Sequence, residues 1–205
     1  MPKFILVLFL FLSLMGCSQS SNKISYIDQI KTHRYNMNIE FSDRKTSPLT
    51  DNDFANFTAL NFFPIDSTYR VYAHFELNEN PRLFQMKTTT DEMPLYKAYG
   101  IATFELNGQN IQLQVYQNQE LITKPGYKNH LFIPFMDATN TKESYGGGRY
   151  LDLEKPKNDT LLIDFNKAYN PYCAYNDKYS CPIPPRENHL DIAIKAGIKT
   201  FKKQG

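Results

Sequence analysis

Apolar and polar positions alternate along most of the middle of the chain. Within residues 69–77, the apolar residues Val71, Ala73 and Phe75 are separated by single polar or aromatic residues. A period of two is typical of a half-buried strand. Similar short runs recur at residues 83–87, 99–106, 111–116, 130–135, 149–153 and 160–165.

These strands have short connections, which favour antiparallel pairing. Asn107-Gly108 joins two of them and supplies the positive φ angles that a two-residue hairpin turn needs. Seven strands at this spacing predict a mainly β (α+β) single domain with its β-rich part at residues 69–165. We expect an antiparallel β-sandwich or a partly closed barrel.

The spacing of apolar positions changes at both ends of the chain. Ile24, Ile27, Ile30, Met37 and Phe41 are spaced by three, three, seven and four, which predicts a helix over about residues 24–41.

A second, short helix is expected over residues 51–60, because Thr50 is suited to cap it and acidic residues follow in its first turn. The apolar positions of the C-terminal region predict an amphipathic helix over residues 189–203 that packs on the sheet, like the N-terminal helix. Those positions are Leu190, Ala193, Ile194, Gly197, Ile198 and Phe201.

The N-terminus carries a secretory signal. Lys3 precedes an unbroken apolar run over residues 4–12, and Leu14-Met15-Gly16-Cys17 follows. The apolar run is too short for a membrane span. A Cys after a small residue, with Leu three positions before it, resembles the lipobox of bacterial lipoproteins. This resemblance implies that residues 1–16 are removed and that Cys17 is diacylated, whereas the alternative is a plain signal peptide with a coincidental Cys.

The lipobox, if it is used, also fixes where the protein is. Residues 17–23 would be a polar tether and residues 24–205 a globular domain on a lipid anchor in the cell envelope. Two or more acyl chains hold a protein stably at a membrane. Ser18, instead of Asp, after the acylated residue favours the outer membrane, with the domain facing the periplasm.

Charge argues against a nucleic-acid partner. The full chain has 23 basic and 21 acidic residues, and removal of the signal with its single Lys3 leaves 22 against 21. A nearly neutral chain has no long-range field to attract nucleic acid. Tyrosine and phenylalanine are abundant, at 14 and 15 residues. Such aromatic residues favour sheets and also line binding grooves.

Two cysteines remain after lipidation. Cys173 and Cys181 form an even pair in an oxidising compartment, which favours a disulfide that closes a short loop. A structural zinc site would need four ligands at tighter spacing, and only His189 lies nearby in sequence. A catalytic thiol lacks an obvious activating neighbour. We expect neither a metal nor a cofactor.

The strongest candidate for a binding loop precedes one of the strands. Gly146, Gly147 and Gly148 stand directly before Arg149 and are flanked by tyrosines. Consecutive glycines let backbone amides converge on an anion, and Arg149 could grip a carboxylate or phosphate. Alternatively, the glycines relieve steric strain in a tight loop and Arg149 forms an internal salt bridge with Glu187 or Asp164.

Polar residues are dense in the long segment 166–188, which we expect to be irregular but ordered. A long ordered loop is either functional or pinned, and the two cysteines and several prolines can pin it. The candidate ligand-binding or catalytic residues here and in the glycine loop are Tyr145, Gly146, Gly147, Gly148, Arg149, Tyr150, Asp164, Asn166, Tyr169, Asn170, Glu187 and Asn188.

The sequence resembles the family known as domain of unknown function 1684 over nearly all of the chain after the signal. The family is named for its lack of an assigned activity, so the resemblance implies no reaction. The motifs that carry it are Pro134-Phe135, Asp137-Ala138-Thr139, residues 145–151, Asp164-Phe165-Asn166, residues 168–171, Cys173-Ala174-Tyr175, Cys181-Pro182, Pro184-Pro185 and Glu187-Asn188.

Two functions remain open at this point. The first is an envelope lipoprotein that binds a small polar or anionic ligand or a partner protein. The second is a hydrolase or isomerase that uses an Arg, carboxylate, Asn and Tyr pocket, with Asp137, Glu143 or Asp152 as further acid/base groups and His130 or His189 as a proton carrier. No nucleophile–base signature supports the second.

Overall fold

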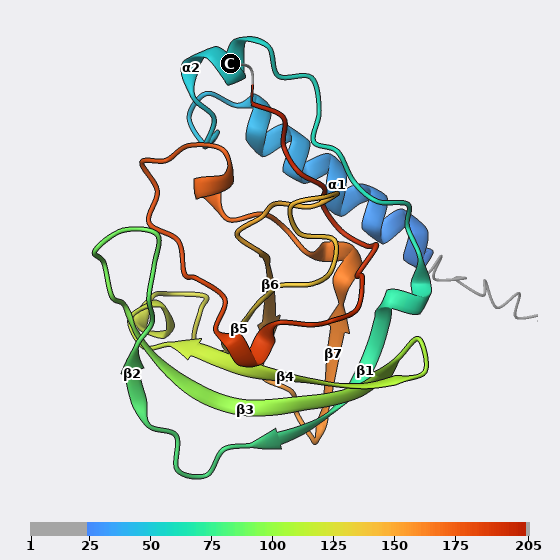
Figure 1. Ribbon diagram of the computed structural model, residues 1–205, viewed down its shortest axis with the longest axis vertical. Helices are drawn as coiled ribbons and strands as arrows, with labels where there is room; N and C mark the ends of the chain where they lie inside the picture. Colours follow the sequence, from blue (N-terminus) through green and yellow to red (C-terminus); the bar gives the residue numbers. More distant parts are fainter. Residues whose placement is uncertain (1–23, 204–205) are drawn as a thin grey trace, which may run out of the picture.

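The computed structural model describes residues 24–203 and shows one curled antiparallel sheet that forms a half-barrel (Figure 1). Its strand order is β6-β5-β4-β3-β1-β7, with β2 paired to β3. All seven expected strands are present, and β3 and β4 are longer than predicted. The strands are β1 (Arg70–Leu77), β2 (Leu83–Gln85), β3 (Leu95–Leu106), β4 (Gln109–Asn118), β5 (His130–Phe135), β6 (Arg149–Glu154) and β7 (Thr160–Asp164).

The hairpin between β3 and β4 forms as predicted. Asn107 and Gly108 have φ angles of 52° and 74°, and Leu106 pairs with Gln109 across the turn. These angles are those of the turn that matches the twist of the paired strands. The sheet is a single curled layer, so the sandwich alternative does not describe it, whereas a partly closed barrel does.

Two α-helices lie together at one end of the molecule (Figure 1). Helix α1 (Tyr26–Ser42) begins at Ser25, whose hydroxyl accepts a bond from the backbone N–H of Asp28, and buries Ile30 and Phe41. Helix α2 (Asp51–Ala55) is capped by Thr50 as expected. It ends at Ala55, so the predicted extent to residue 60 is wrong.

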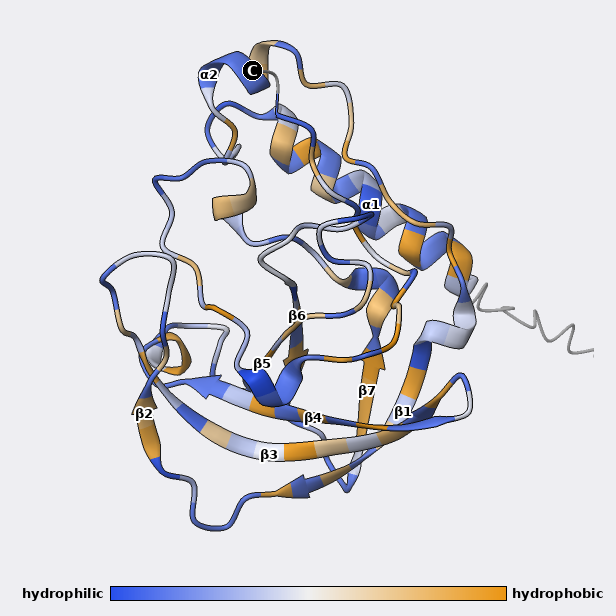
Figure 2. Ribbon diagram, in the orientation of Figure 1, coloured by the Kyte–Doolittle hydropathy of each residue, from blue (hydrophilic) through white to orange (hydrophobic). Residues whose placement is uncertain are grey.

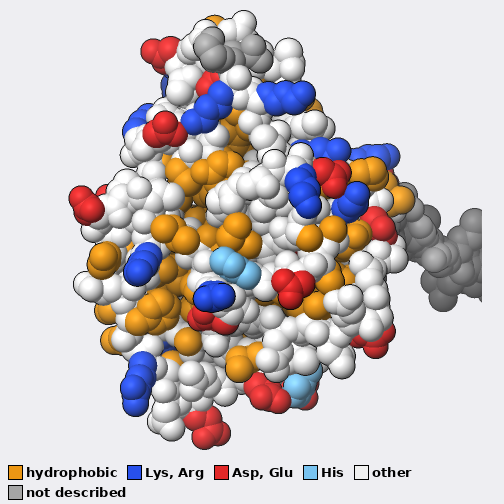
Figure 3. Space-filling model, viewed as in Figure 1, with side chains coloured by type: hydrophobic (Ala, Val, Ile, Leu, Met, Phe, Trp, Pro, Cys, Tyr) orange, Lys and Arg blue, Asp and Glu red, His pale blue; other side chains and the backbone are white. Residues whose placement is uncertain are grey.

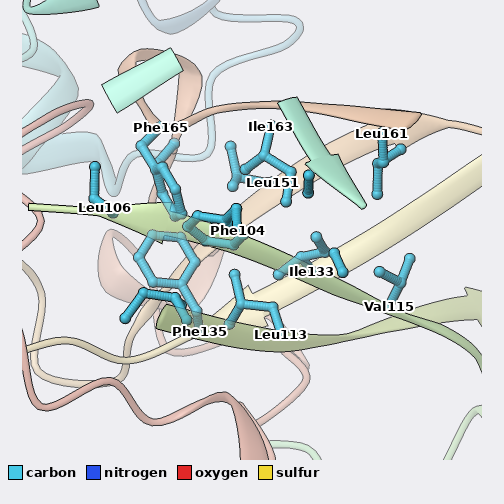
Figure 4. Packing of buried hydrophobic residues seen from close by; sticks show 14 of the residues in the cluster. Phe104, Leu106, Leu113, Val115, Ile133, Phe135, Leu151, Leu161, Ile163 and Phe165 are labelled. Carbon is cyan, nitrogen blue, oxygen red and sulfur yellow. The ribbon is translucent and has the colours of Figure 1, made fainter. Parts of the chain in front are cut away.

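The main core fills the concave side of the sheet. Figure 4 shows the rings of Phe104, Phe135 and Phe165 gathered within it, with ring centroids 5.4–6.0 Å apart. The aliphatic side chains of Leu113 and Ile133 are completely buried beside them. Figure 2 shows the alternation of apolar and polar residues along the strands that produces this core.

A second cluster, which we call the aromatic cluster, uses the other set of alternating positions. Phe132 on β5 and Tyr150 on β6 face away from the main core, and their rings meet edge to face at 4.8 Å. Tyr96, Tyr116 and Met86 complete the buried part of this cluster. Strand β5 is therefore buried on both sides, which explains its continuous apolar sequence.

The predicted C-terminal helix is wrong. Residues 189–203 contain no helix and run in extended form beside α1 (Figure 1). Ile194, Ala196 and Ile198 are the fully buried residues here, so the period is two. The backbone at Gly197 has a φ of 76°, and a Cβ there would lie 2.6 Å from the carbonyl oxygen of Phe165. This backbone conformation interrupts a helix at its centre.

Candidate functional site

Arg149 lies in the protein interior and not in a binding cleft. Its side chain is completely buried, and Nη2 donates to Oδ2 of Asp137 at 2.7 Å, also completely buried. The expected partners were Glu187 and Asp164, whereas the ion pair joins β6 to the segment after β5. Burial lowers the pKa of the guanidinium and the Asp137 carboxylate partly opposes this shift. Arg149 is therefore a structural residue.

The same guanidinium holds the C-terminal segment in place. Arg149 donates to the carbonyl oxygens of Ile194 at 2.8 Å, Ala196 at 2.5 Å and Ile198 at 3.3 Å. Asp137 accepts from the backbone N–H of Ile194 at 3.1 Å. Carbonyl groups of every second residue can point toward one guanidinium only when the backbone is extended. These bonds to Arg149 therefore hold the segment in an extended, non-helical conformation.

The glycine loop has a steric role. Gly148 has a φ of 90°, and a Cβ there would lie 2.7 Å from the carbonyl oxygen of Phe135. Gly146 and Gly147 precede it in the turn, where Gly147 lies against the ring of Tyr145. Because they lack side chains, the glycines allow the loop before β6 to pack closely against β5. Arg149, which follows them, points into the core. The interpretation of this loop as an anion-binding site required the Arg149 side chain at the loop, and that side chain is paired with Asp137 in the core instead.

Asp164 and Asn166 also support the fold. Asp164 accepts from the hydroxyl of Tyr26 at 2.9 Å, and Asn166 donates to the same hydroxyl at 2.9 Å and to the carbonyl of Asp66 at 2.7 Å. Both side chains are buried. They attach the start of α1 and the segment before β1 to the end of β7.

Glu187 and Asn188 cover the sheet where β4 and β5 separate. Buried Asn188 donates to the carbonyl oxygens of Gln114 and Pro134 and accepts from the N–H of Gln114 at 2.7 Å. Glu187 is exposed and accepts from the hydroxyl of Tyr116 at 2.7 Å. Asn188 thus replaces backbone bonds that the two strands do not make with each other.

Cys173 and Cys181 are adjacent but free in the structure. The N–H of Cys173 donates to Sγ of Cys181 at 3.2 Å, and the hydroxyl of Tyr145 lies 3.9 Å from Sγ of Cys173. A hydrogen bond from the Cys181 thiol lowers the pKa of Cys173 to about 6 and raises that of Cys181. The predicted proximity is confirmed, and the bond between the two sulfurs stays a prediction.

A cleft of about 470 Å³ lies between α1, the outer face of β6 and segment 169–182. Figure 3 shows hydrophobic side chains gathered between the helical end of the molecule and the strands. We call this the tyrosine cleft. Its lining residues are His33, Met37, Glu40, Phe41, Tyr150, Asp152, Tyr169, Asn170, Pro171, Tyr172, Tyr175, Tyr179, Ser180, Cys181 and Pro182.

The tyrosine cleft contains three of the twelve candidate ligand-binding or catalytic residues, Tyr150, Tyr169 and Asn170, and also Asp152, which was named as a further acid/base group. The backbones of Tyr150 and Tyr169 pair with each other, which brings the segment after β7 onto β6. The contribution of α1 was missed, because sequence spacing does not say which surface a helix packs against. The alternation along β6, with Tyr150 and Asp152 opposite Leu151, was the signal that could have revealed a second functional face.

A hydrogen-bond network runs from the cleft to the edge of the sheet. Tyr169 donates to Oδ2 of Asp152 at 2.8 Å, and Nε2 of His130 lies 2.9 Å from Oδ1 of the same carboxylate. Burial, followed by the nearby Asp152 charge, raises the pKa of Tyr169 well above its usual value. Tyr169 therefore stays protonated and donates at neutral pH.

Other polar groups lie deeper in the cleft wall. Asn170 is buried, and its Oδ1 has no hydrogen-bond partner within residues 24–203. Burial, with the positive charge of Lys167, lowers the pKa of His33. The imidazole of His33 is consequently neutral at physiological pH.

A second hollow of about 620 Å³ lies between β2 and residues 183–189. It is larger and is lined by His189, the possible proton carrier, but by none of the twelve candidate ligand-binding or catalytic residues; Phe84, Met86 and Pro184 are among its walls. Within the described part of the chain no group of three or more metal-ligating side chains is present. Nor does any described helix have the length and hydropathy to cross a membrane.

Comparisons with known proteins place the chain in a group without an assigned reaction. Residues 55–199 match the family model described as a protein of unknown function, DUF1684. The solution NMR structure of an uncharacterised protein from Haloarcula marismortui is similar, with 33% sequence identity and a TM-score of 0.67. The match covers 85% of this chain and 94% of that one. Comparison with curated proteins gives no match.

Proposed function

This chain belongs to the DUF1684 family, and we propose that it is a membrane-anchored cell-envelope lipoprotein that binds a small polar ligand in the tyrosine cleft. The observation that carries the binding proposal is the cleft itself. Its volume of about 470 Å³ falls in the range of about 300–1,000 Å³ usual for small-molecule sites. Aromatic walls with a few convergent polar groups are also typical of such sites.

Two features of the cleft support a bound ligand over a solvent-filled gap. Tyr172 is 39% exposed although its ring lies 5.2 Å from that of Tyr179, so an aromatic surface remains open. Asn170 leaves a buried acceptor without a partner in the described part of the chain, and such atoms are costly. The earlier expectation of an anionic ligand depended on Arg149, whose charge is already neutralised by Asp137.

The anchoring proposal rests on the N-terminal sequence. Cys17 lies outside the described residues, seven positions before Ile24. A chain of that length spans at most about 25 Å, so acylation would hold α1 near the bilayer. Ile27 and Ile39 on α1 and Ile24 just before it are exposed, which suits a position beside a lipid surface.

The binding proposal is tested by screening small molecules for thermal stabilisation of the mature protein. Tyr172→Ala removes a cleft wall, whereas Tyr72→Ala removes another exposed tyrosine, on β1 and outside the cleft. Ligands should stabilise the wild type and the Tyr72 variant and lose their effect in the Tyr172 variant. Equal stabilisation of both variants would place the ligand elsewhere.

An enzyme is the alternative, and the network of Tyr169, Asp152 and His130 favours it. A carboxylate shared by a phenol and an imidazole could take part in general acid–base chemistry as a hydrolase or isomerase. Arg149, which the sequence placed in the catalytic pocket, does not line the cleft and takes no part in this network. Turnover that disappears in Asp152→Asn but survives in the exposed control Glu105→Gln would favour this alternative.

A further inference from the structure

We propose that the tyrosine cleft selects a ligand with a protonated amine, that is, an organic ammonium ion. This inference rests on the proposed function and specifies the ligand class of the same cleft. Three independent properties of the lining lead to it: its charge, the balance of its hydrogen-bond donors and acceptors, and its aromatic surface.

The charge of the lining is negative. Glu40 on α1 and Asp152 on β6 face the cleft from opposite walls, and none of the described lining residues is Lys or Arg. His33 is neutral for the reason given above. Asp152 also lies beside His130, whose Nε2 is 2.9 Å from its Oδ1, and its second oxygen accepts from the Tyr169 hydroxyl. A cation therefore fits this cleft better than an anion.

Most of the polar hydrogens around the cleft are already used inside the protein. Tyr172 donates to Oε1 of Glu40 at 2.5 Å and Tyr169 donates to Asp152 at 2.8 Å. Tyr150 donates to the carbonyl oxygen of Pro182. These phenols thus offer a ligand lone pairs and ring faces, but not hydrogens.

The polar hydrogens of Ser180 and Asn170, two other lining residues, are also used inside the protein. Ser180 donates its hydroxyl hydrogen to Thr88 at 3.0 Å. Asn170 donates through Nδ2 to the carbonyl of Lys199 at 3.0 Å and to the Tyr175 hydroxyl at 3.4 Å, which fixes its amide orientation. The Oδ1 atom of Asn170 has no hydrogen-bond partner within the described residues. The free hydrogen-bonding capacity of the lining consists mainly of acceptors, so a complementary ligand must donate.

Aromatic rings supply the third property. Phe41 and Tyr175 meet edge to face at 4.7 Å, and Tyr172 and Tyr179 pack at 5.2 Å, so ring faces and edges bound the cleft on two sides. The negative face of an aromatic ring attracts cations. Ammonium ions combine positive charge with two or more N–H donors, and they match all three properties together.

Three probes with the same ring separate charge from shape: benzylammonium, benzyl alcohol and benzoate. Dissociation constants are measured at pH 8 and low salt by NMR titration of the mature protein, following signals of residues 33–41 and 169–182. We expect benzylammonium to bind at least about tenfold more tightly than benzoate, with benzyl alcohol between them. Added salt should weaken benzylammonium binding most.

The carboxylates are tested with isosteric variants. Glu40→Gln should weaken benzylammonium binding by about threefold or more, and the pair Glu40→Gln with Asp152→Asn should bring its affinity down to that of benzyl alcohol. Benzyl alcohol binding should stay the same in these variants. Glu143→Gln is the matched control, because Glu143 pairs with Lys195 outside the cleft and should change neither affinity.

The possible outcomes are distinct. Binding of benzyl alcohol or benzoate at the cleft signals with equal or higher affinity than benzylammonium would overturn the ammonium inference and leave the proposed function standing. A preference for benzylammonium that survives the double carboxylate variant would also overturn it. If neither these probes nor any screened compound shifts the cleft signals, both the inference and the binding function are wrong.

Discussion

Replacing Arg149 tests whether this residue supports the fold or binds a ligand. Arg149→Met keeps most of the side-chain volume but leaves the Asp137 carboxylate buried without its cation. Asp137 retains backbone donors from Thr139 and Ile194, at 2.9 and 3.1 Å, which offset only part of the loss. Breaking a completely buried ion pair costs about 3–5 kcal/mol.

The carbonyl groups of the C-terminal segment add to this cost. Three of them, at Ile194, Ala196 and Ile198, lose a charged donor in a buried region. Each unsatisfied group costs about 1–3 kcal/mol unless the segment moves to reach water. We therefore expect a loss of at least about 3–5 kcal/mol, a large share of the roughly 5–15 kcal/mol that stabilises a typical domain.

Urea unfolding at 25 °C measures this loss. A loss of about 3–5 kcal/mol shifts the midpoint by at least about 1 M at the usual m values. Arg82→Ala is the control, because Arg82 is exposed, and it should change stability by no more than about 0.5 kcal/mol. Adding Asp137→Asn to Arg149→Met should recover part of the loss, because it removes the unpaired charge. A loss below about 1 kcal/mol with ligand binding abolished would refute the structural role of Arg149.

Four further predictions concern the anchor, the two thiols and the sheet. Cys17→Ser should abolish lipid labelling and release the protein from membranes; a variant that remains labelled would contradict the lipobox assignment. Protein purified from the envelope should have no free thiol at Cys173 or Cys181, and reduction should lower its Tm by several degrees. In the reduced protein the pKa of Cys173 is about 6 in the folded state, below its value in the unfolded state. The Cys173 thiolate therefore stabilises the fold above the unfolded pKa, and this contribution is lost as the pH falls through 6. Cys173→Ser should remove this pH dependence of the free energy of unfolding. Asn188→Ala should cost about 3 kcal/mol in chemical denaturation because three buried bonds to Gln114 and Pro134 disappear, and a loss under about 1 kcal/mol would show that water replaces them.

The strands could be predicted because their signal is local. Alternation with a period of two located β1 and β4, and Asn107-Gly108 located the hairpin between β3 and β4. The same signal was misinterpreted at the C-terminus, where Ile194, Ala196 and Ile198 also alternate. The apolar residues of this segment fit a helical spacing equally well. The hydrogen bonds to the guanidinium of Arg149, which is distant in sequence, decide between helix and extended chain.

The site was harder to predict because its parts are far apart in the sequence. Segment 169–182 drew attention through its polar residues and tyrosines, and it does form a wall of the cleft. Its other wall comes from Glu40 and Phe41 on α1, about 130 residues earlier. A buried Arg and a ligand-binding Arg look the same in sequence, and only the position of Asp137 distinguishes them.

The tyrosine cleft as a ligand site is the central claim, and contact between ligand and protein tests it most directly. The best ligand from the stabilisation screen is bound to the mature protein, and intermolecular nuclear Overhauser effects are recorded. The account predicts contacts from ligand protons to the rings of Tyr172 and Tyr179. Contacts confined to Phe84 and Met86, in the second hollow beside β2, would contradict it.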